Sequence, residues 1–319
     1  MKLILIFLLA LLGCKGKESG GTTSPQSLCG FERPPYIVRA SFKNNATTDA
    51  ELLLFGLHTK PEKVLAELNQ LDDVIEEVKV SENLDKIIAM GDFNAGCSYL
   101  SSSEYSSLDL TTKGYNWVIP YSADTNVASS QCAYDRILTW GLPAVSHYNI
   151  FTTGITDQLS DHYPVETTIN FNGNVYRVAA FNLQRYGPTK AGDSSFLSTV
   201  RSYIATTDII LLQEITTTDQ SLINLLIPSG YDYVVSERLG TTSYKEQYAF
   251  VFNQKIQIQK DFVFQSTTTC PTPSSGEPNS CTSDGYDCGS GLYTTPGGQC
   301  RATNKDGENK RVRDCCCLN

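Results

Sequence analysis

The sequence has no excess of positive charge. Its 319 residues include 25 lysines and arginines against 34 aspartates and glutamates, a formal net charge of −9. A protein that binds nucleic acid only by neutralising phosphates is normally basic. The acidic balance therefore argues against a simple nucleic-acid-binding module. It does not argue against an enzyme whose bound metal ion supplies positive charge at one site.

The apolar run at the N-terminus, residues 3–12, is too short to cross a bilayer as a helix. It ends in the letters LLGC, which resemble a bacterial lipobox. The resemblance implies a lipoprotein signal peptide over 1–13 and lipid attachment to Cys14; an ordinary signal peptide with an incidental cysteine is the alternative. The small polar residues of 14–29 predict a flexible tether. We therefore expect an exported lipoprotein, anchored to the membrane on its periplasmic or cell-surface side.

Few of the 11 cysteines lie in the middle of the chain. Seven occur after residue 265, where Thr, Pro, Ser and Gly dominate and apolar periodicity disappears. Without Cys14 an even count of ten remains, which suits disulfides in an exported protein. The triplet at 315–317 has no recognisable metal-ligand spacing. Residues 265–319 are thus predicted to be a Cys-rich tail stapled by disulfides.

Between the tether and the tail, apolar patterns predict strands that alternate with two helices. The first helix has Pro61 at its first turn and a buried stripe of Val64, Leu68, Leu71, Ile75 and Val78. The second covers about 194–206. Strands are predicted at 34–42, 51–58, 86–90, 117–119, 136–138, 208–213, 231–236, 247–253 and 256–264. This order favours an α+β fold in which sheets pack on each other with helices outside.

Residues 165–182 are predicted to be two strands joined by Asn172-Gly173. Asn-Gly is the strongest two-residue hairpin signal, because both residues accept a positive φ.

Polar side chains follow three buried strands where each strand ends. Asp92 and Asn94 follow Ile87–Met90 in the segment MGDFNAGCSY, Glu214 ends IILLQE, and Asn182 ends VAAFN. A carboxylate at the end of an apolar strand is poorly explained as surface decoration. Oxygen donors of this kind suit Mg²⁺ or Mn²⁺ rather than Zn²⁺.

Histidine is scarce, with only His58, His147 and His162 in the chain. His58 ends the strand pattern LLLFGLH, and His162 lies in SDHYPV beside Asp161. Histidine is the side chain best suited to proton transfer near neutral pH. We expect His58 and His162 to act in catalysis and His147 to lie on the surface.

These motifs resemble those of the pancreatic deoxyribonuclease I family, within the endonuclease/exonuclease/phosphatase superfamily. GDFN, SDH-x-PV, AAFN-x-Q and LLQE carry the superfamily resemblance, and AGCSY, SERLG and SYKE narrow it to deoxyribonuclease I. The resemblance covers residues 30–264 and implies a four-layer α/β/β/α sandwich. In the family, AAFN and LLQE come before GDFN and SDH; here they come after. The motif order therefore predicts a circular permutation, with the ancestral ends joined at Asn172-Gly173.

The resemblance also implies roles for individual residues. Glu246 would orient His58, and Asp135 would orient His162. The catalytic set is then His58, His162, Glu246, Asp135, Asp92 and Asn94. The metal ligands would be Glu214, Asp161, Asn182 and Asp92. The substrate contacts would be Tyr244, Arg33, Asn94, Gln184 and Tyr134.

Two further implications concern a loop and its ends. Cys97 and Cys132 would form the family's disulfide, which closes a loop of about 36 residues and is worth roughly 3–4 kcal/mol. Asp124 and Asn126 resemble a calcium site, and an ordinary turn is an equal alternative.

Thr216, Thr241 and Gln247 stand where the family usually has basic residues. Duplex binding should accordingly be weaker or less dependent on salt.

The expected function is that of a monomeric, Mg²⁺-dependent endonuclease that cleaves DNA, with Mn²⁺ as the alternative metal and Ca²⁺ as a second ion. One rival is a phosphoesterase of the same superfamily that acts on lipid head groups or nucleotides. Another is a non-catalytic surface module whose tail binds a partner. The sequence leaves open which histidine is the acid and whether single or double strands are preferred.

Overall fold

The computed structural model describes residues 30–143, 145 and 147–264, and the backbone of three short strands further on. Those strands, β13 (Leu292–Thr294), β14 (Cys300–Thr303) and β15 (Asn309–Arg311), form a small antiparallel sheet that belongs to a separate unit. The predicted signal peptide, Cys14, tether and tail disulfides lie outside the described residues. Among the described helices, none is long and apolar enough to span a membrane.

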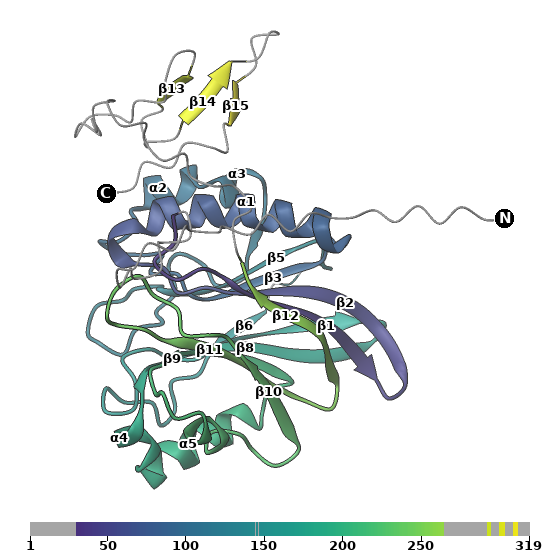
Figure 1. Cartoon of the computed structure of the whole chain (residues 1–319), viewed down its shortest axis with the longest axis vertical. Helices are drawn as coiled ribbons and strands as arrows, with labels where there is room; N and C mark the ends of the chain where they lie inside the picture. Colours follow the sequence, from purple (N-terminus) through teal and green to yellow (C-terminus); the bar gives the residue numbers. More distant parts are fainter. Residues whose placement is uncertain are drawn as a thin grey trace, which may run out of the picture. The chain divides into compact units, whose positions relative to one another are not determined.

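Residues 31–264 contain two six-stranded sheets (Figure 1). The first has the order β12-β1-β2-β3-β5-β4, with strands Ile256–Val263, Tyr36–Asn44, Thr47–Gly56, Ile87–Asp92, Asp135–Trp140 and Asn116–Trp117. The second has the order β10-β11-β9-β8-β7-β6, with strands Tyr231–Val235, Gln247–Asn253, Ile209–Ile215, Asn174–Tyr186, Val165–Phe171 and Tyr148–Ile150. Each sheet has one parallel pair at its centre, β2 with β3 and β8 with β9.

The helices lie on the outer faces of the sheets, so the unit has four layers, as Figure 1 shows. The first sheet is covered by α1 (Val64–Glu82), α2 (Ser102–Ser107) and α3 (Asp109–Thr112). The second is covered by α4 (Pro188–Ala191), α5 (Ser194–Ile204) and α6 (Ser221–Asn224). The predicted α/β/β/α sandwich is confirmed.

Strict alternation along the central strands produces these layers. In β8, Val178 and Ala180 face the core between the sheets, whereas Ala179 and Phe181 face the helices. Successive strand residues point to opposite faces, so a strand buried on both faces needs an uninterrupted apolar run. That requirement explains why β8 and β9 have continuous apolar sequences.

The predicted elements agree with the structure apart from their ends and a few short pieces. The stripe on α1 is buried as expected. The prediction that Pro61 lies in the first turn of the helix is wrong, because Pro61 begins a separate 3-10 turn, Pro61–Lys63, and α1 starts at Val64. The short elements α2, α3, α4, α6 and β6 are not predicted, because three to six residues are too few to show a period. α2 had one usable signal, the capping box between Ser101 and Glu104.

The Asn172-Gly173 turn joins β7 to β8, as predicted. Phe171 pairs with Asn174, and the turn residues have φ values of 53° and 86°. The turn prediction is confirmed.

One edge of the two sheets collects the polar strand ends. The parallel strands β2, β3, β8 and β9 all end there, and their antiparallel neighbours β5 and β11 begin there. In register, Asp92 at the end of β3 is opposite Asp135 at the start of β5. Ligand sites in sheets with parallel strands lie beyond the carboxyl ends of those strands.

Gly91, at the penultimate position of β3, lies between the Leu57 backbone and the Gln213 side chain of the second sheet. Its φ is +134°, and an added Cβ would lie 2.4 Å from the Leu57 carbonyl oxygen and 2.7 Å from the Gln213 side-chain nitrogen. No side chain fits there without moving backbone. The glycine of the GDFN motif is therefore required by packing.

Replacing Gly91 by alanine should lower the free energy of unfolding by more than about 3 kcal/mol, since it combines a positive φ with overpacking. Gly173→Ala is the matched control: its φ is also positive, but nothing lies within 4 Å of its added Cβ. We expect that control to cost only about 1–2 kcal/mol. Urea unfolding followed by circular dichroism measures both. Equal losses in the two variants would contradict the packing argument.

Candidate active site

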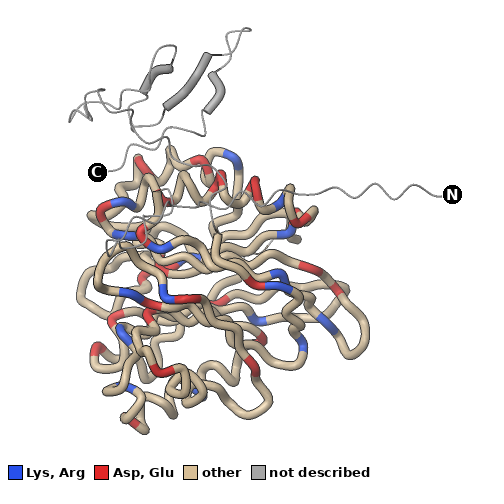
Figure 2. The backbone as a smooth tube through the Cα atoms, viewed as in Figure 1, with Lys and Arg blue, Asp and Glu red and all other residues tan. Residues whose placement is uncertain are grey.

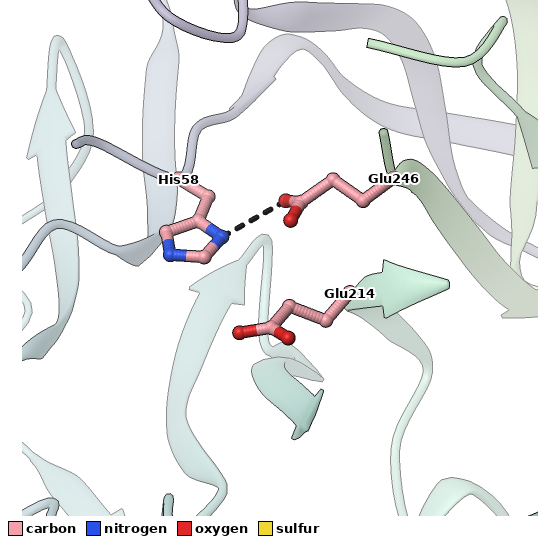
Figure 3. A group of neighbouring side chains, drawn as sticks. All are labelled: His58, Glu214 and Glu246. Carbon is pink, nitrogen blue, oxygen red and sulfur yellow. Dashed lines mark hydrogen bonds and ion pairs between the residues drawn. The ribbon is translucent and has the colours of Figure 1, made fainter. Parts of the chain in front are cut away.

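His58 is held by a buried carboxylate from the other sheet. His58 follows β2, and Glu246 immediately precedes β11. The Nδ1 atom of His58 lies 2.9 Å from Glu246 Oε1 (Figure 3). Its backbone N–H donates to the Tyr248 hydroxyl at 3.0 Å. Glu246 is fully buried and His58 is nearly so. The carboxylate fixes the ring and leaves Nε2 to face the site.

His162 repeats this arrangement. Its Nδ1 lies 2.8 Å from Oδ2 of the fully buried Asp135. Its backbone N–H donates to Ser160 Oγ, and the Ser160 hydroxyl donates to the Asn182 carbonyl. The SDH loop is thereby tied to the end of β8. The predicted pairs His58–Glu246 and His162–Asp135 are both present in the structure.

The two imidazoles meet at one oxygen. Nε2 of His58 lies 3.3 Å from Asp92 Oδ2, and Nε2 of His162 lies 3.5 Å from the same atom. Asp92 is almost fully buried. Burial by itself would raise the pKa of Asp92, but the nearby His162 and His58 lower it below 3.8. Asp92 therefore stays ionised between two proton-carrying groups.

Opposing effects also determine the histidine pKa values. Burial by itself would lower the pKa of His162, but the adjacent Asp135, followed by Asp92, raises it to about 10. For His58, burial is again opposed by Glu246, and the net pKa lies above 6.5. In the metal-free chain the paired carboxylates thus raise the pKa of both imidazoles, and that of His162 far enough to keep it protonated at neutral pH.

Glu214, at the end of β9, faces the same site (Figure 3). Its oxygens accept from neutral donors: the Asn182 amide at 3.1 Å, the Arg185 backbone N–H at 3.1 Å and the Tyr244 hydroxyl at 2.8 Å. The Asn182 amide also donates to Asp92 Oδ2 at 3.1 Å, so it bridges the two carboxylates.

This donor set fits a hard divalent cation. In the described part of the chain, no lysine or arginine forms an ion pair with Glu214. Asp161, at the mouth of the site, has an exposed carboxylate 3.7 Å from His162 Nε2. Two carboxylate–histidine groups have ligand atoms close enough to share an ion: His58, Glu214 and Glu246, and Asp92, Asp135 and His162. Oxygen-rich sites of this type suit Mg²⁺ or Mn²⁺.

Backbone strain is concentrated here. Eight non-glycine residues have positive φ among those described, and four of them are Asn94 (47°), Gln184 (47°), Arg185 (61°) and Glu214 (56°). Left-handed conformations are unfavourable for such residues and persist only where surrounding contacts enforce them. They turn the chain sharply just after β3, within β8 and within β9, which directs these side chains to the site.

The predicted substrate contacts line or adjoin a cleft of about 470 Å³, to which His58, Arg33, Gln184 and Tyr244 contribute. Asn94 is buried, and its amide donates to the Thr59 carbonyl. The ring of Tyr134 lies 6.4 Å from that of His162, centroid to centroid. The site residues predicted from GDFN, SDH, AAFN and LLQE are thus brought together, although their motifs lie as far as 120 positions apart, from residue 94 to 214.

The loop expected to hold calcium runs beside the SDH segment, where Asn126 pairs with His162 in an isolated β-bridge, but the hydrogen bonds of its Asp124 and Asn126 side chains stay within the loop. Asp124 Oδ1 accepts from the backbone N–H groups of Asn126 and Cys132 at 3.3 Å, and the Asn126 amide donates to Ser130. These side chains close their own loop, and calcium binding there stays a prediction. The predicted disulfide between Cys97 and Cys132 is present, with Cα atoms 5.6 Å apart.

Two positioning residues were not predicted. Gln213 is fully buried in β9; its Oε1 accepts from the Asp92 N–H at 2.7 Å and its Nε2 donates to the Leu57 carbonyl at 2.9 Å. Glu67 in α1 accepts from the N–H groups of Glu32 and Lys60 at 2.9 Å. For Gln213 the available signal was a polar residue inside an otherwise apolar strand; Glu67 lies outside the apolar stripe of α1, and nothing in the sequence pattern marks it.

The amino-acid sequence of this chain is similar to those of known proteins. No known protein-family model matches the chain. It is 38% identical to deoxyribonuclease-1 of Bos taurus over 168 residues, 48% of this chain and 57% of that protein. For the Mus musculus protein the identity is 41% over 153 residues, 44% and 53% of the two chains. The chain thus spans little more than half the length of these relatives. The resemblance to deoxyribonuclease I is confirmed over that part.

Solved structures give weaker similarities. The endonuclease/exonuclease/phosphatase from Bacteroides vulgatus matches with a TM-score of 0.40 and 11% identity, over 68% of this chain and 88% of that one. TDP2 of D. rerio, complexed with a single-strand DNA product, matches with a TM-score of 0.38 and 11% identity, over 63% and 83%.

In metal-free protein, we expect His162 to carry protons on both ring nitrogens at pH 7.5, and its pKa to lie well above 6.5. Because the folded-state pKa is raised, this pairing stabilises the fold fully below about pH 6.5, and the contribution is lost as the pH rises toward 10. Histidine ring ¹⁵N NMR across this range is the measurement. Asp135→Asn should bring the pKa down; deprotonation of wild-type His162 near pH 6.5 would contradict the assignment.

Proposed function

We propose that the chain is a Mg²⁺-dependent endonuclease that hydrolyses DNA phosphodiester bonds. The observation that carries the proposal is the convergence of two carboxylate-oriented imidazoles on one oxygen of Asp92, beside Glu214. Hydrolysis of a phosphodiester needs a proton acceptor for the attacking water, a proton donor for the leaving oxygen and compensation of phosphate charge. The two imidazoles can serve the proton transfers, and the carboxylates Asp92, Asp161 and Glu214 could hold the metal ion that compensates the phosphate charge.

The proton donor is assigned to His162. Its pKa is raised to about 10, so it holds its proton at neutral pH. Asp135 keeps Nδ1 occupied, so Nε2 is the nitrogen that can give up a proton to a leaving oxygen. His58, held in the same way by Glu246, is the complementary group on the other side of Asp92.

Glu214, Asp92 and Asp161 would hold the metal ion. A bound Mg²⁺ supplies charge compensation on the phosphate oxygens. Asn182 holds Asp92 and Glu214 at a fixed separation by donating to both. The Tyr244 hydroxyl fixes the second oxygen of Glu214.

DNA is the proposed substrate because the sequence similarity is to deoxyribonuclease-1. The acidic net charge suits local metal-assisted phosphate binding better than binding by an extended basic face. Figure 2 shows Lys and Arg interspersed with Asp and Glu along the backbone. The related activity on lipid head groups or nucleotides is an outcome of the test below.

The wild-type protein should nick supercoiled plasmid in the presence of Mg²⁺, and EDTA should stop the reaction. His58→Ala and His162→Ala should each reduce the rate by about 10²–10⁴-fold, the usual contribution of general acid–base catalysis. Gel assays of nicked and linear plasmid measure this. His147→Ala is the matched control, because His147 is exposed and is not among the residues that line the cleft.

The same preparations are assayed on sphingomyelin, phosphoinositides and nucleotides. Intact plasmid at every divalent ion tried, with hydrolysis of one of these, would replace the nuclease by the phosphoesterase. If the folded protein hydrolysed none of these substrates, the non-catalytic surface module would be the remaining hypothesis.

We further propose that the motif order arose by circular permutation. Two observations support it. The similarity to deoxyribonuclease-1 runs over about half of each chain in one collinear segment. The places that a permutation would join and open also fit: Asn172-Gly173 is a tight turn, and the Phe264 N–H donates to the Pro35 carbonyl at 2.9 Å, so residues 264 and 35 are neighbours.

Reordering the chain tests this. A variant that begins at residue 173, continues through 264, passes by a short Gly-Ser linker to 31 and ends at 172 should fold and nick plasmid at a rate within a few-fold of wild type. A second variant opened between Leu211 and Leu212, inside the buried strand β9, should not fold. If the first variant also failed to fold, the two orders would not be equivalent.

A further inference from the structure

Some of the cationic side chains around the cleft donate hydrogen bonds to groups of the protein, and one does not. Two arginines line it, Arg33 and Arg185. Arg33 is 7% exposed, and its guanidinium donates to the carbonyls of His58 and Thr59 at 3.1 Å. Its Nε also lies 3.6 Å from Glu246 Oε1. Arg33 is thus committed to holding His58 and its partner in place.

Three neighbouring cations are committed in the same way. Lys190 donates to the carbonyls of Leu159, Leu183 and Gln184 at 2.6–2.8 Å. Arg238 donates to the carbonyls of Thr216, Thr217 and Lys245, and Lys245 donates to that of Gly240. These side chains hold the loops of the cleft.

Arg185 is different. Its side chain is exposed, and among the described residues its guanidinium forms no hydrogen bond or ion pair. The guanidinium carbon lies 5.6 Å from the centre of the Tyr244 ring, a cation–π contact. Stacking on a ring leaves the edge of the guanidinium, with its N–H groups, free to bind a ligand.

The position of Arg185 is fixed relative to Glu214. The Arg185 backbone N–H and the Tyr244 hydroxyl both donate to Oε2 of Glu214. Arg185 also has a left-handed backbone, with φ +61°. Its charge is therefore presented within one side-chain length of the carboxylate that faces the two catalytic imidazoles. An oriented, unpaired guanidinium in a cleft is suited to bidentate binding of a phosphate.

We propose that Arg185, stacked on Tyr244, binds a phosphate group adjacent to the scissile one in a polynucleotide strand. The inference rests on the proposed nuclease function and specifies its substrate as a polyanionic strand rather than an isolated phosphodiester. A substrate with only one phosphate cannot use this contact. Arg185 therefore contributes to binding of the strand and not to the chemical step at Asp92.

The experiment compares two substrates. For Arg185→Gln, we expect KM for a short DNA duplex to rise about tenfold in 50–100 mM salt, with kcat within twofold. The slope of log kcat/KM against log salt should become shallower by about 1, since one phosphate contact is lost. Hydrolysis of bis(4-nitrophenyl) phosphate should not change. Arg185→Lys, which keeps the charge, should recover part of the loss.

Arg201→Gln is the matched control. Arg201 is an exposed arginine on α5 whose Nε donates only to the Leu197 carbonyl one turn earlier. It should behave as wild type on both substrates. A binding measurement complements the kinetics: in a His162→Ala background, fluorescence anisotropy with the labelled duplex should show a Kd about tenfold higher when Arg185→Gln is added.

The outcomes are distinct. Wild-type protein that cleaves DNA together with an Arg185→Gln variant that cleaves it equally well would overturn the inference and leave the nuclease intact. Equal losses on the duplex and on the small diester would also overturn it, because Arg185 would then only support Glu214. Wild-type protein that leaves DNA intact would overturn the proposed function and this inference with it.

Discussion

A single buried amide holds the two halves of the site together. Gln213 lies in the second sheet, yet its side chain bonds the backbone of β3 at Asp92 and the segment after β2 at Leu57. Buried amide groups must find partners, and here both partners belong to the opposite sheet. The Leu57 carbonyl and the Gln213 amide lie so close to position 91 that it accepts only glycine. Gln213 thereby holds Asp92, on which both imidazoles converge, in place relative to the second sheet.

The site is built from two similar halves, each with a parallel pair of strands, a histidine and a buried carboxylate. His58 follows β2 of the first sheet and is oriented by Glu246, just before β11 of the second; His162 precedes β7 of the second sheet and is oriented by Asp135 of the first. Each pair thus crosses the core. The Nε2 atoms of both histidines lie beside Asp92 Oδ2, and their positive charge lowers the pKa of the buried Asp92 carboxyl. Removing one carboxylate would leave a buried charge without compensation, which is far costlier than losing a surface ion pair.

Structural and ligand-binding charges are separated around the cleft. Arg33, Lys190 and Arg238 donate to backbone carbonyls and hold loops, whereas the Arg185 guanidinium stacks on Tyr244 and has no hydrogen-bond partner among the residues that the structure describes. The left-handed backbones at Gln184, Arg185 and Glu214 direct these side chains toward one another. The strain is tolerated because each segment is anchored by a strand before it and by hydrogen bonds after it.

The sequence by itself determined the two apolar central strands of each sheet, the α1 stripe, the Asn172-Gly173 turn and the polar residues at the strand ends. These are local properties: side-chain periods of 2 and 3.6, turn chemistry, and polar groups that interrupt apolar runs. The short elements α2, α4 and β6 were missed because they have too few residues to show a period. The stacking of the sheets decided which strand ends meet. It is for this reason that Asp92 and Glu214 both accept from the one amide of Asn182. The roles of Gln213 and Arg185 were also decided there, because a bridge between sheets and an unpaired guanidinium exist only once distant segments are in contact.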